Sequence, residues 1–228
     1  MIKNNKKIIV ATGGTGGHIF PAVSLTNYLN KNGFETILTT DERGLKFIDK
    51  EYSQKTFLIN SSPIIKKSKL ISFYKIILAF FNSIFFLLKN KPKFIFGMGG
   101  YASFPICLAG FILRIPFIIY ENNLYMGKAN RYLTPLTRKI FVSYEDIQGI
   151  NIKYKKKITV IGNILRENII NYTKTNKKKS EEILNILVLG GSQAAKIFAE
   201  KLPHIFFECK KNNINLKIYQ QCLNHQKF

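Results

Sequence analysis

The sequence predicts an α/β fold with a mostly parallel sheet covered by helices on both faces, followed by the start of a second domain of the same kind. Three observations predict this fold class. Short apolar segments alternate with longer helical patterns from residue 7 to residue 161. The first segment ends in a glycine-rich turn at residues 13–17, where a helical pattern follows. The same order of strand, glycine turn and helix recurs from residue 186.

Each expected element of the first domain is a short apolar run or a stretch of helical periodicity. The expected strands are Lys7–Thr12, Glu35–Thr40, Thr56–Ile59, Phe94–Met98, Phe117–Glu121, Lys139–Ser143 and Ile158–Ile161. The expected helices are Pro21–Lys31, Leu70–Leu88, Ala102–Leu113 and Lys128–Leu136. Ligands of such sheets bind at the carboxyl ends of the strands. The glycine turns after Thr12 and Met98 both fall at that edge.

The second strand–glycine–helix pattern divides the chain into three expected parts. Residues 1–167 form a Rossmann-like domain, residues 168–182 a polar, Lys-rich linker, and residues 183–228 the start of another domain. That start holds the strand Ile186–Leu189, a helix after the glycine turn, one more helix and a further strand near Leu216–Tyr219. Domains usually need about 50 residues or more. We therefore expect the chain to be truncated relative to its functional architecture.

The opening turn contains the chemistry that the sequence shows most clearly. It reads Ile8-Ile9-Val10-Ala11-Thr12-Gly13-Gly14-Thr15-Gly16-Gly17-His18. Glycines let a ligand approach the backbone, and the N–H groups at a helix start attract anions, which favours a phosphate or diphosphate. The spacing fits neither the dinucleotide fingerprint nor the Walker A loop. His18 is the group placed to titrate near neutral pH. The alternative is a structural turn with spare glycines.

Charge and composition limit the partners. The formal net charge is +22, and no acidic residue occurs between Glu51 and Glu121. A region whose charged residues are all basic should attract anionic surfaces. A membrane is the favoured surface, because the sequence contains no motif that reads nucleic acid. We therefore expect no nucleic-acid partner. The basic residues of this region are Lys55, Lys66, Lys67, Lys69, Lys75, Lys89, Lys91, Lys93 and Arg114.

The cysteines indicate the redox state of the cellular compartment, and the aspartates indicate whether a metal site is expected. The three cysteines are widely spaced and odd in number, which suits a reducing compartment without a disulfide framework. No signal peptide is expected, because the first apolar run is short and ends in glycines. The chain has three aspartates and no D-x-D pair. No metal site and no cofactor are therefore expected.

The apolar segment Leu70–Leu88 has three interpretations. Ser72, Lys75, Ala79, Asn82, Ser83 and Lys89 fall on one side at helical spacing, and Phe73, Ile76, Ile77, Phe80, Phe81, Ile84 and Leu88 fall on the other. This amphipathic pattern predicts a core helix that packs on the sheet. A helix that also touches a membrane is the second interpretation, because lysines flank it on both sides. A transmembrane span is the third, although it would interrupt the α/β alternation.

Five ordered motifs resemble the MurG family across nearly the whole chain. They are Gly13-Gly14-Thr15-Gly16-Gly17-His18-Ile19-Phe20-Pro21, Gly97-Met98-Gly99-Gly100-Tyr101, Glu121-Asn122-Asn123, Gly162-Asn163-Ile164-Leu165-Arg166 and Gly190-Gly191-Ser192-Gln193. The resemblance implies a GT-B glycosyltransferase with two Rossmann-like domains. It also implies transfer of N-acetylglucosamine from UDP-N-acetylglucosamine to lipid I, with inversion and without an essential bound metal, at the cytoplasmic face of the bacterial inner membrane.

The resemblance also implies roles for particular residues. Those expected to contact substrate are Thr15, Gly16, Gly17, Asn123, Arg166 and Ser192 on the donor side, with Tyr101, Gly14 and Gly100 as further contacts. Arg166 can clamp a phosphate or help join the domains. His18 is the candidate general base, or else it orients the acceptor diphosphate. Glu121 is a second candidate base, or it orients His18.

The chain departs from the family pattern at three places. Tyr120 replaces a usual His, Asn122 a usual Gln, and Ala194-Ala195 a usual Gly-Ala. Much of the donor site that the family carries in its second domain has no counterpart here. Two alternatives therefore stay open: a non-catalytic module that binds a lipid diphosphate and a membrane, and another GT-B glycosyltransferase.

Overall fold

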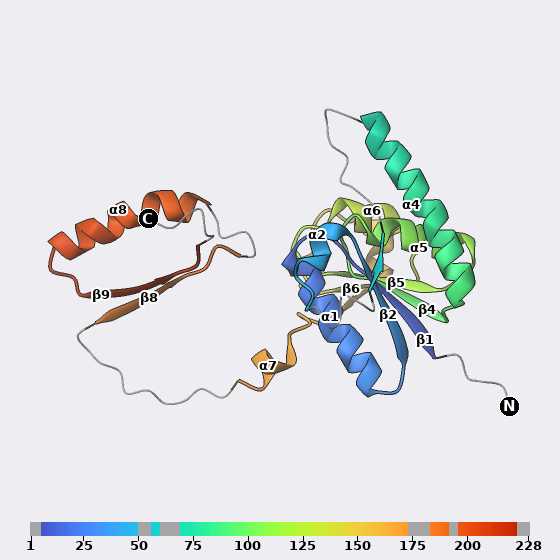
Figure 1. The fold of residues 1–228 in the computed structure, drawn as a ribbon, viewed down its shortest axis with the longest axis horizontal. Coiled ribbons are helices and arrows are strands. Elements are labelled where there is room, and N and C mark those ends of the chain that lie inside the picture. Colours follow the sequence, from blue (N-terminus) through green and yellow to red (C-terminus); the bar gives the residue numbers. More distant parts are fainter. Residues whose placement is uncertain (1–5, 50–55, 60–68, 173–182, 192–195, 223–228) are drawn as a thin grey trace. The chain divides into compact units, whose positions relative to one another are not determined.

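The computed structural model describes residues 6–49, 56–59, 69–172, 183–191 and 196–222. It divides into two compact units, residues 1–171 and 172–228 (Figure 1). The strands of the first unit are β1 Lys7–Ala11, β2 Glu35–Thr40, β3 Phe57–Leu58, β4 Phe94–Gly97, β5 Phe117–Glu121, β6 Lys139–Val142 and β7 Ile158–Val160. Its helices are α1 Gly16–Lys31, α2 Glu42–Leu45, α4 Lys69–Asn90, α5 Ser103–Ile112, α6 Lys128–Leu133, the 3-10 helix η1 Ile152–Lys157 and α7 Glu167–Ile170.

The seven strands form one parallel sheet in the order β3-β2-β1-β4-β5-β6-β7. This confirms the predicted fold class. The strand order reverses direction between β1 and β4, which are paired from Ile8↔Phe94 to Ala11↔Gly97. A parallel sheet opens a crevice for ligands at such a reversal, outside the carboxyl ends of the strands. The two glycine-rich loops that follow β1 and β4 therefore lie next to each other.

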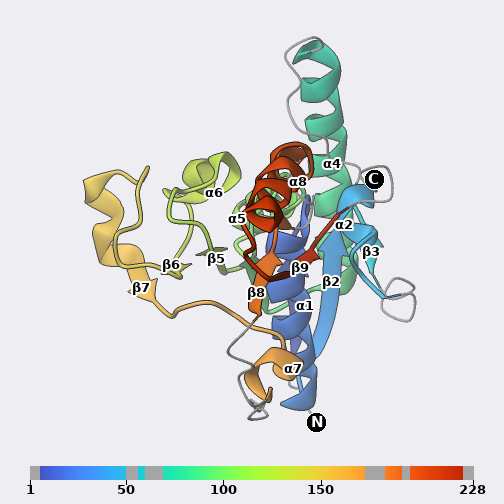
Figure 2. The same cartoon turned by 90° about the vertical axis from the view of Figure 1, so that its left-hand side faces the viewer.

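Alternation along the strands divides the core into two layers. Side chains of a strand point to opposite faces in turn. Ile9 and Ala11 face a layer with α4 and α5, whereas Ile8 and Val10 face a layer with α1. Figure 2 shows α1 running alongside β2, and α1 also contacts β1. Both faces of the sheet are thus covered, which explains why β1 is almost entirely apolar.

Helix α1 begins at Gly16, five residues before the predicted start at Pro21. Thr15 is its extended N-cap residue (φ −104°, ψ 167°), and Pro21 lies inside the helix. A proline inside a helix leaves the carbonyl four residues earlier without its N–H donor. Here Asn122 Nδ2 donates to that carbonyl, the Gly17 oxygen, at 2.7 Å. The helix can therefore start directly at the glycine loop.

Helix α4 packs on the core as predicted, with Phe80 and Ile84 on the core side as expected, but the buried face is displaced around the helix from the predicted one. The sequence analysis assigned Ala79 and Ser83 to the polar side, but both are buried against the core. Ile77, Phe81 and Leu88, which were assigned to the core side, are at least 36% exposed. Small residues allow close approach between α4 and the neighbouring α5, and the Ser83 hydroxyl donates to the Ala79 carbonyl at 2.6 Å. No helix in the described part of the chain is long and apolar enough to cross a membrane.

The second unit pairs two strands in parallel, β8 Leu184–Val188 and β9 Leu216–Gln220, with helix α8 Lys196–Lys211 between them in the chain. Gly191 adopts a positive φ of 73° at the turn after β8. Within this unit Leu187, Ile197 and Phe207 are each more than half exposed. The predicted strand, glycine turn and closing strand are confirmed for the described residues, but the described part between the strands holds one helix, α8, where two were expected.

Candidate active site at the meeting of two glycine loops

The loop after β1 touches the loop after β4 directly. A Cβ on Gly13 would lie 2.8 Å from the Ala102 Cβ, and a Cβ on Gly100 would lie 2.1 Å from the Gly13 oxygen. Gly100 also has a positive φ of 80°. Only glycine combines this backbone conformation with so close an approach. The two loops are therefore joined backbone to backbone at the point where the strand order reverses.

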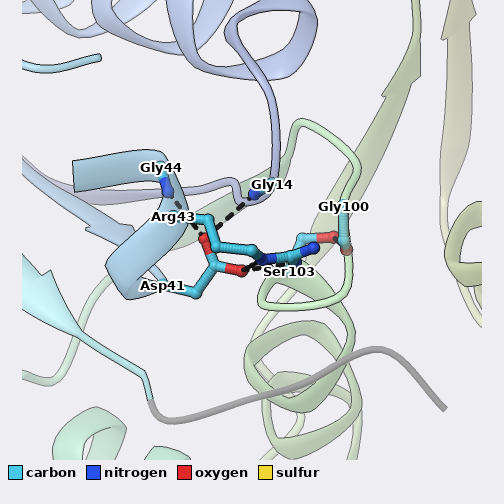
Figure 3. A network of polar contacts seen from close by, with 6 residues as sticks. All are labelled: Gly14, Asp41, Arg43, Gly44, Gly100 and Ser103. Carbon is cyan, nitrogen blue, oxygen red and sulfur yellow. Dashed lines mark hydrogen bonds and ion pairs between the residues drawn. The ribbon is translucent and has the colours of Figure 1, made fainter. Parts of the chain in front are cut away.

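A buried carboxylate fixes the first loop (Figure 3). Asp41, which follows β2, is 2% exposed, and its Oδ1 accepts from the Gly14 N–H at 3.0 Å and the Gly44 N–H at 2.9 Å. Its Oδ2 accepts from Arg43 Nε at 3.0 Å and Nη2 at 2.6 Å. On the neighbouring loop the Ser103 hydroxyl donates to the Gly100 carbonyl at 2.9 Å. The Gly14 N–H, an expected anion donor, is thus already bonded to a carboxylate.

His18 lies in the first turn of α1 and faces the second loop. A Cβ on Gly99 would be 2.8 Å from both Cε1 and Nδ1 of the imidazole, so the ring rests on the glycine backbone. Burial lowers the pKa of His18 below its ordinary value of 6.5, while the Glu121 carboxylate and the Met98 backbone oppose that shift. Its buried Nδ1 has no partner in hydrogen-bond geometry among the described residues. Burial therefore favours the neutral ring, which is the form able to accept a proton.

Glu121 ends β5 and is fully buried. Its Oε1 accepts from the Asn123 backbone N–H at 3.1 Å and from Asn123 Nδ2 at 2.8 Å. Its Oε2 accepts from the Gly127 N–H at 2.9 Å and from Asn130 Nδ2 at 3.0 Å. Four N–H donors therefore surround this carboxylate. The arrangement holds the loop after β5 and acts on His18 through charge.

A cavity of about 280 Å³ opens beside these groups. It is lined by His18, Gly99, Gly100, Tyr101, Glu121, Gly127, Lys128, Ala129 and Asn130. Four of the predicted site residues, namely His18, Gly100, Tyr101 and Glu121, are thus brought together. No group of three His, Cys, Asp or Glu side chains in the described ranges is placed to hold a metal ion.

The other predicted site residues lie around this cavity or outside the described residues. Thr15, Gly16 and Gly17 form the start of α1. Asn123 is tied to Glu121 as described above. Arg166 precedes α7 and places its guanidinium 4.7 Å from the ring centroid of Phe20 on α1, so it does not line the cavity. Ser192 and the neighbouring Ala194 and Ala195 fall outside the described residues.

Tyr120, at the position where the family usually has a histidine, is buried and acts as an anchor. Its hydroxyl lies 2.9 Å from the Ser143 Oγ and 3.2 Å from the Gly162 carbonyl, to which it donates. It accepts from the Ile164 N–H at 3.2 Å. The hydroxyl thus ties β5 and β6 to the segment that leads to Arg166.

Sequence reasoning missed four residues of this site: Asp41, Arg43, Lys128 and Asn130. Asp41 stands at the carboxyl end of β2, where polar residues meet ligands in parallel sheets, and this position is a signal that could have found it. The other three lie within the short helices α2 and α6, away from the strand ends and glycine turns, and carry no comparable signal.

The chain is similar to known proteins over nearly its whole length. Residues 8–142 match the model of the glycosyltransferase family 28 N-terminal domain. The chain is 41% identical to a Pelagibacter ubique protein and 38% identical to one from Rickettsia felis, over 98% and 95% of its length respectively. Both relatives are called UDP-N-acetylglucosamine–N-acetylmuramyl-(pentapeptide) pyrophosphoryl-undecaprenol N-acetylglucosamine transferase. The chain spans only 63% and 62% of the lengths of these two relatives.

The solved structures agree with the family match. The crystal structure of Acinetobacter baumannii MurG superposes with a TM-score of 0.68 at 25% identity, covering 96% of this chain and 59% of that one. The structure of S. aureus MnaA with UDP, at 13% identity and a TM-score of 0.59, shares the fold. The predicted GT-B architecture and the resemblance to MurG proteins are thereby confirmed. With more than half of its residues matched by the family model, the chain belongs to glycosyltransferase family 28.

Proposed function

We propose that this chain supplies the acceptor-binding side of an enzyme that transfers N-acetylglucosamine from UDP-N-acetylglucosamine to lipid I, giving lipid II in peptidoglycan synthesis. One observation carries the proposal: the two glycine loops meet at the reversal of strand order, and the imidazole of His18 rests on the second loop and lines the cavity there. The names of the MurG relatives support the choice of substrates.

The proposed chemistry is a single displacement at the anomeric carbon of the donor sugar. The acceptor hydroxyl loses its proton to His18 as its oxygen attacks. The new glycosidic C–O bond forms while the bond from the sugar to the diphosphate breaks, and UDP leaves with the electron pair. Glu121 stabilises the resulting imidazolium by its charge. His18 then returns the proton to solvent.

Three of the donor contacts proposed from the family resemblance lie at the start of α1. Thr15, Gly16 and Gly17 contribute backbone at the positive end of that helix dipole, which favours the developing charge on the diphosphate. The cation–π contact with Phe20 holds Arg166 beside the same helix. Asn123 and Ser192 complete the proposed set, and Gly14, Gly100 and Tyr101 belong to the acceptor side. No bound metal or cofactor takes part in this proposal.

We also propose peripheral attachment to an anionic membrane at the cytoplasmic face of the inner membrane. The support is a set of exposed apolar side chains on α4 and at the end of the neighbouring α5. Its exposed members are Tyr74, Ile77, Leu78, Phe81, Phe85, Leu88, Phe111 and Ile112. Exposed lysines such as Lys75 and Lys89 lie on the same helix. An apolar face with basic neighbours is the composition that membrane surfaces bind.

The transfer proposal is tested with the chain extended by the C-terminal part of the Pelagibacter ubique relative. Transfer of labelled N-acetylglucosamine to a lipid I analogue is measured for the native sequence and for His18→Ala, with His204→Ala as the matched control. We expect turnover to fall by about 10²–10⁴-fold in His18→Ala, with little change in donor affinity. A loss below about threefold would remove His18 as the base, and an extended chain without any transfer would reject the proposed function.

A further inference from the structure

The cavity contains two side chains that the proposed mechanism does not use. Of the groups that line it, Glu121 already accepts four hydrogen bonds, and His18 is assigned to the proton of the acceptor hydroxyl. Lys128 and Asn130 line the same space, two residues apart at the start of α6. Both are therefore available to a ligand in this cavity.

Lys128 is the one cavity-lining residue with a fixed positive charge. Its side chain is exposed and forms no ion pair within the described ranges of the chain. The backbone on either side of it is held, because the Gly127 N–H and Asn130 Nδ2 both donate to Glu121 Oε2. A cation on a fixed stretch of backbone beside a cavity is placed to meet an anion.

Asn130, which also lines the cavity, has an unsatisfied side-chain acceptor. The residue is 1% exposed, and its Nδ2 donates to the Tyr120 carbonyl and to Glu121 Oε2, both at 3.0 Å. These two bonds fix the orientation of the amide. Its Oδ1 then has no donor among the described residues. A buried acceptor without a donor is unfavourable, so a ligand that brings an N–H or O–H group would gain a hydrogen bond here.

We propose that Lys128 and Asn130 form a paired subsite for the acceptor, in which Lys128 binds a phosphate oxygen and Asn130 Oδ1 accepts from an N–H or O–H of the attached sugar. The ligand class is a phosphorylated N-acetyl sugar. The identity of the acceptor rests on the proposed function, whereas the anion subsite stands on the cavity itself. Neither residue touches the reacting atoms, so both act in binding and positioning.

The first test is an NMR titration of the ¹⁵N-labelled chain with inorganic pyrophosphate. Affinity is read from the amide signals of Gly99, Gly100 and Asn130, because surface lysines of a chain with a charge of +22 also bind anions. We expect Lys128→Gln to weaken binding at these amides by at least about fivefold. The matched control is Lys139→Gln, which removes an exposed lysine of β6 that does not line the cavity. Equal affinity of Lys128→Gln and the native chain overturns the role of Lys128.

The second test needs no variant of the buried Asn130. The native chain is titrated with N-acetylglucosamine 1-phosphate and, separately, with inorganic phosphate. We expect the sugar phosphate to bind at least about threefold more tightly and to be the one ligand of the two that shifts the side-chain amide signals of Asn130. Equal affinities with unmoved Asn130 signals overturn its part in the subsite.

These outcomes are separable from those of the transfer assay. In one case the extended chain transfers the sugar, and Lys128→Gln binds pyrophosphate as tightly as the native chain. This result would reject the subsite and leave the proposed function standing. In the other case Lys128→Gln loses pyrophosphate binding, and the extended native chain shows no transfer. This result would reject the proposed function and leave the anion subsite standing.

Discussion

The side chain of Asn122 donates from Nδ2 to the backbone oxygen of Gly17 at 2.7 Å and so replaces the N–H that Pro21 lacks. The Gly17 carbonyl is four residues before Pro21, which is the position that a proline leaves without its helical donor. The donor comes from the loop after β5. One hydrogen bond thus connects the helix that carries His18 to the loop that follows Glu121.

This relationship predicts a coupling between Asn122 and Pro21. Asn122→Ala should lower the free energy of unfolding by about 0.5–1.5 kcal/mol, because the Gly17 carbonyl loses its donor. In a Pro21→Ala background the new N–H of residue 21 can bond to that carbonyl, so the same substitution should cost much less. Urea unfolding followed by far-UV circular dichroism gives the four free energies of this cycle. Additive effects of the two substitutions would contradict the assignment.

The Asp41 network predicts a large effect of removing one charge. Asp41→Asn keeps the volume but places an amide N–H₂ group or a weaker acceptor against donors from Gly14, Gly44 and Arg43. We expect the free energy of unfolding to fall by about 1–3 kcal/mol. The matched control is Asp146→Asn at an exposed position, where the change should stay within about 0.5 kcal/mol. Equal effects in urea unfolding would show that the buried carboxylate does not hold the loop.

The lowered pKa of His18 predicts acid sensitivity of the folded state. Since the folded protein favours the neutral imidazole, the contribution of His18 to stability is present above the unfolded pKa of 6.5 and is lost as the pH falls through the folded pKa. The native chain should therefore lose stability between pH 7 and pH 5 faster than His18→Gln does. Urea unfolding at several pH values measures this difference. Parallel pH profiles, or an NMR titration that places the pKa of His18 above 6.5, would contradict the burial argument.

The exposed apolar surface of α4 predicts membrane binding that depends on both apolar contact and charge. Phe81→Ser with Phe85→Ser should reduce co-sedimentation with phosphatidylglycerol vesicles by about tenfold or more, because two large side chains no longer enter the bilayer interface. Binding of the native chain should also weaken with added salt. The matched control combines Ile152→Ser with Tyr172→Ser, two exposed residues on other segments. Equal loss in both double variants would show that α4 is not the contact.

The local sequence determined the elements and the loops of the first unit. β2 and β5 have the predicted bounds, and the other strands differ by one or two residues at their ends, because apolar periodicity and turn residues act over a few positions. The glycines at Gly13 and Gly100 identified the carboxyl edge of the sheet, and His18 was recognised from its place beside them. These signals lie within one strand–turn–helix unit, so a single sequence contains them.

Tertiary structure decided which partner each polar group found and which helix face was buried. Gly14 donates to Asp41 across 27 positions, and Gly17 accepts from Asn122 across 105, distances over which local patterns carry no information. The face of α4 that packs on the core contains Ala79 and Ser83 because close approach to α5 requires small residues, although the apolar pattern of the sequence assigned both to the polar side. Lys128 and Asn130 line the same cavity as His18 although they are far from it in the chain. The order of strands in the sheet makes these residues neighbours.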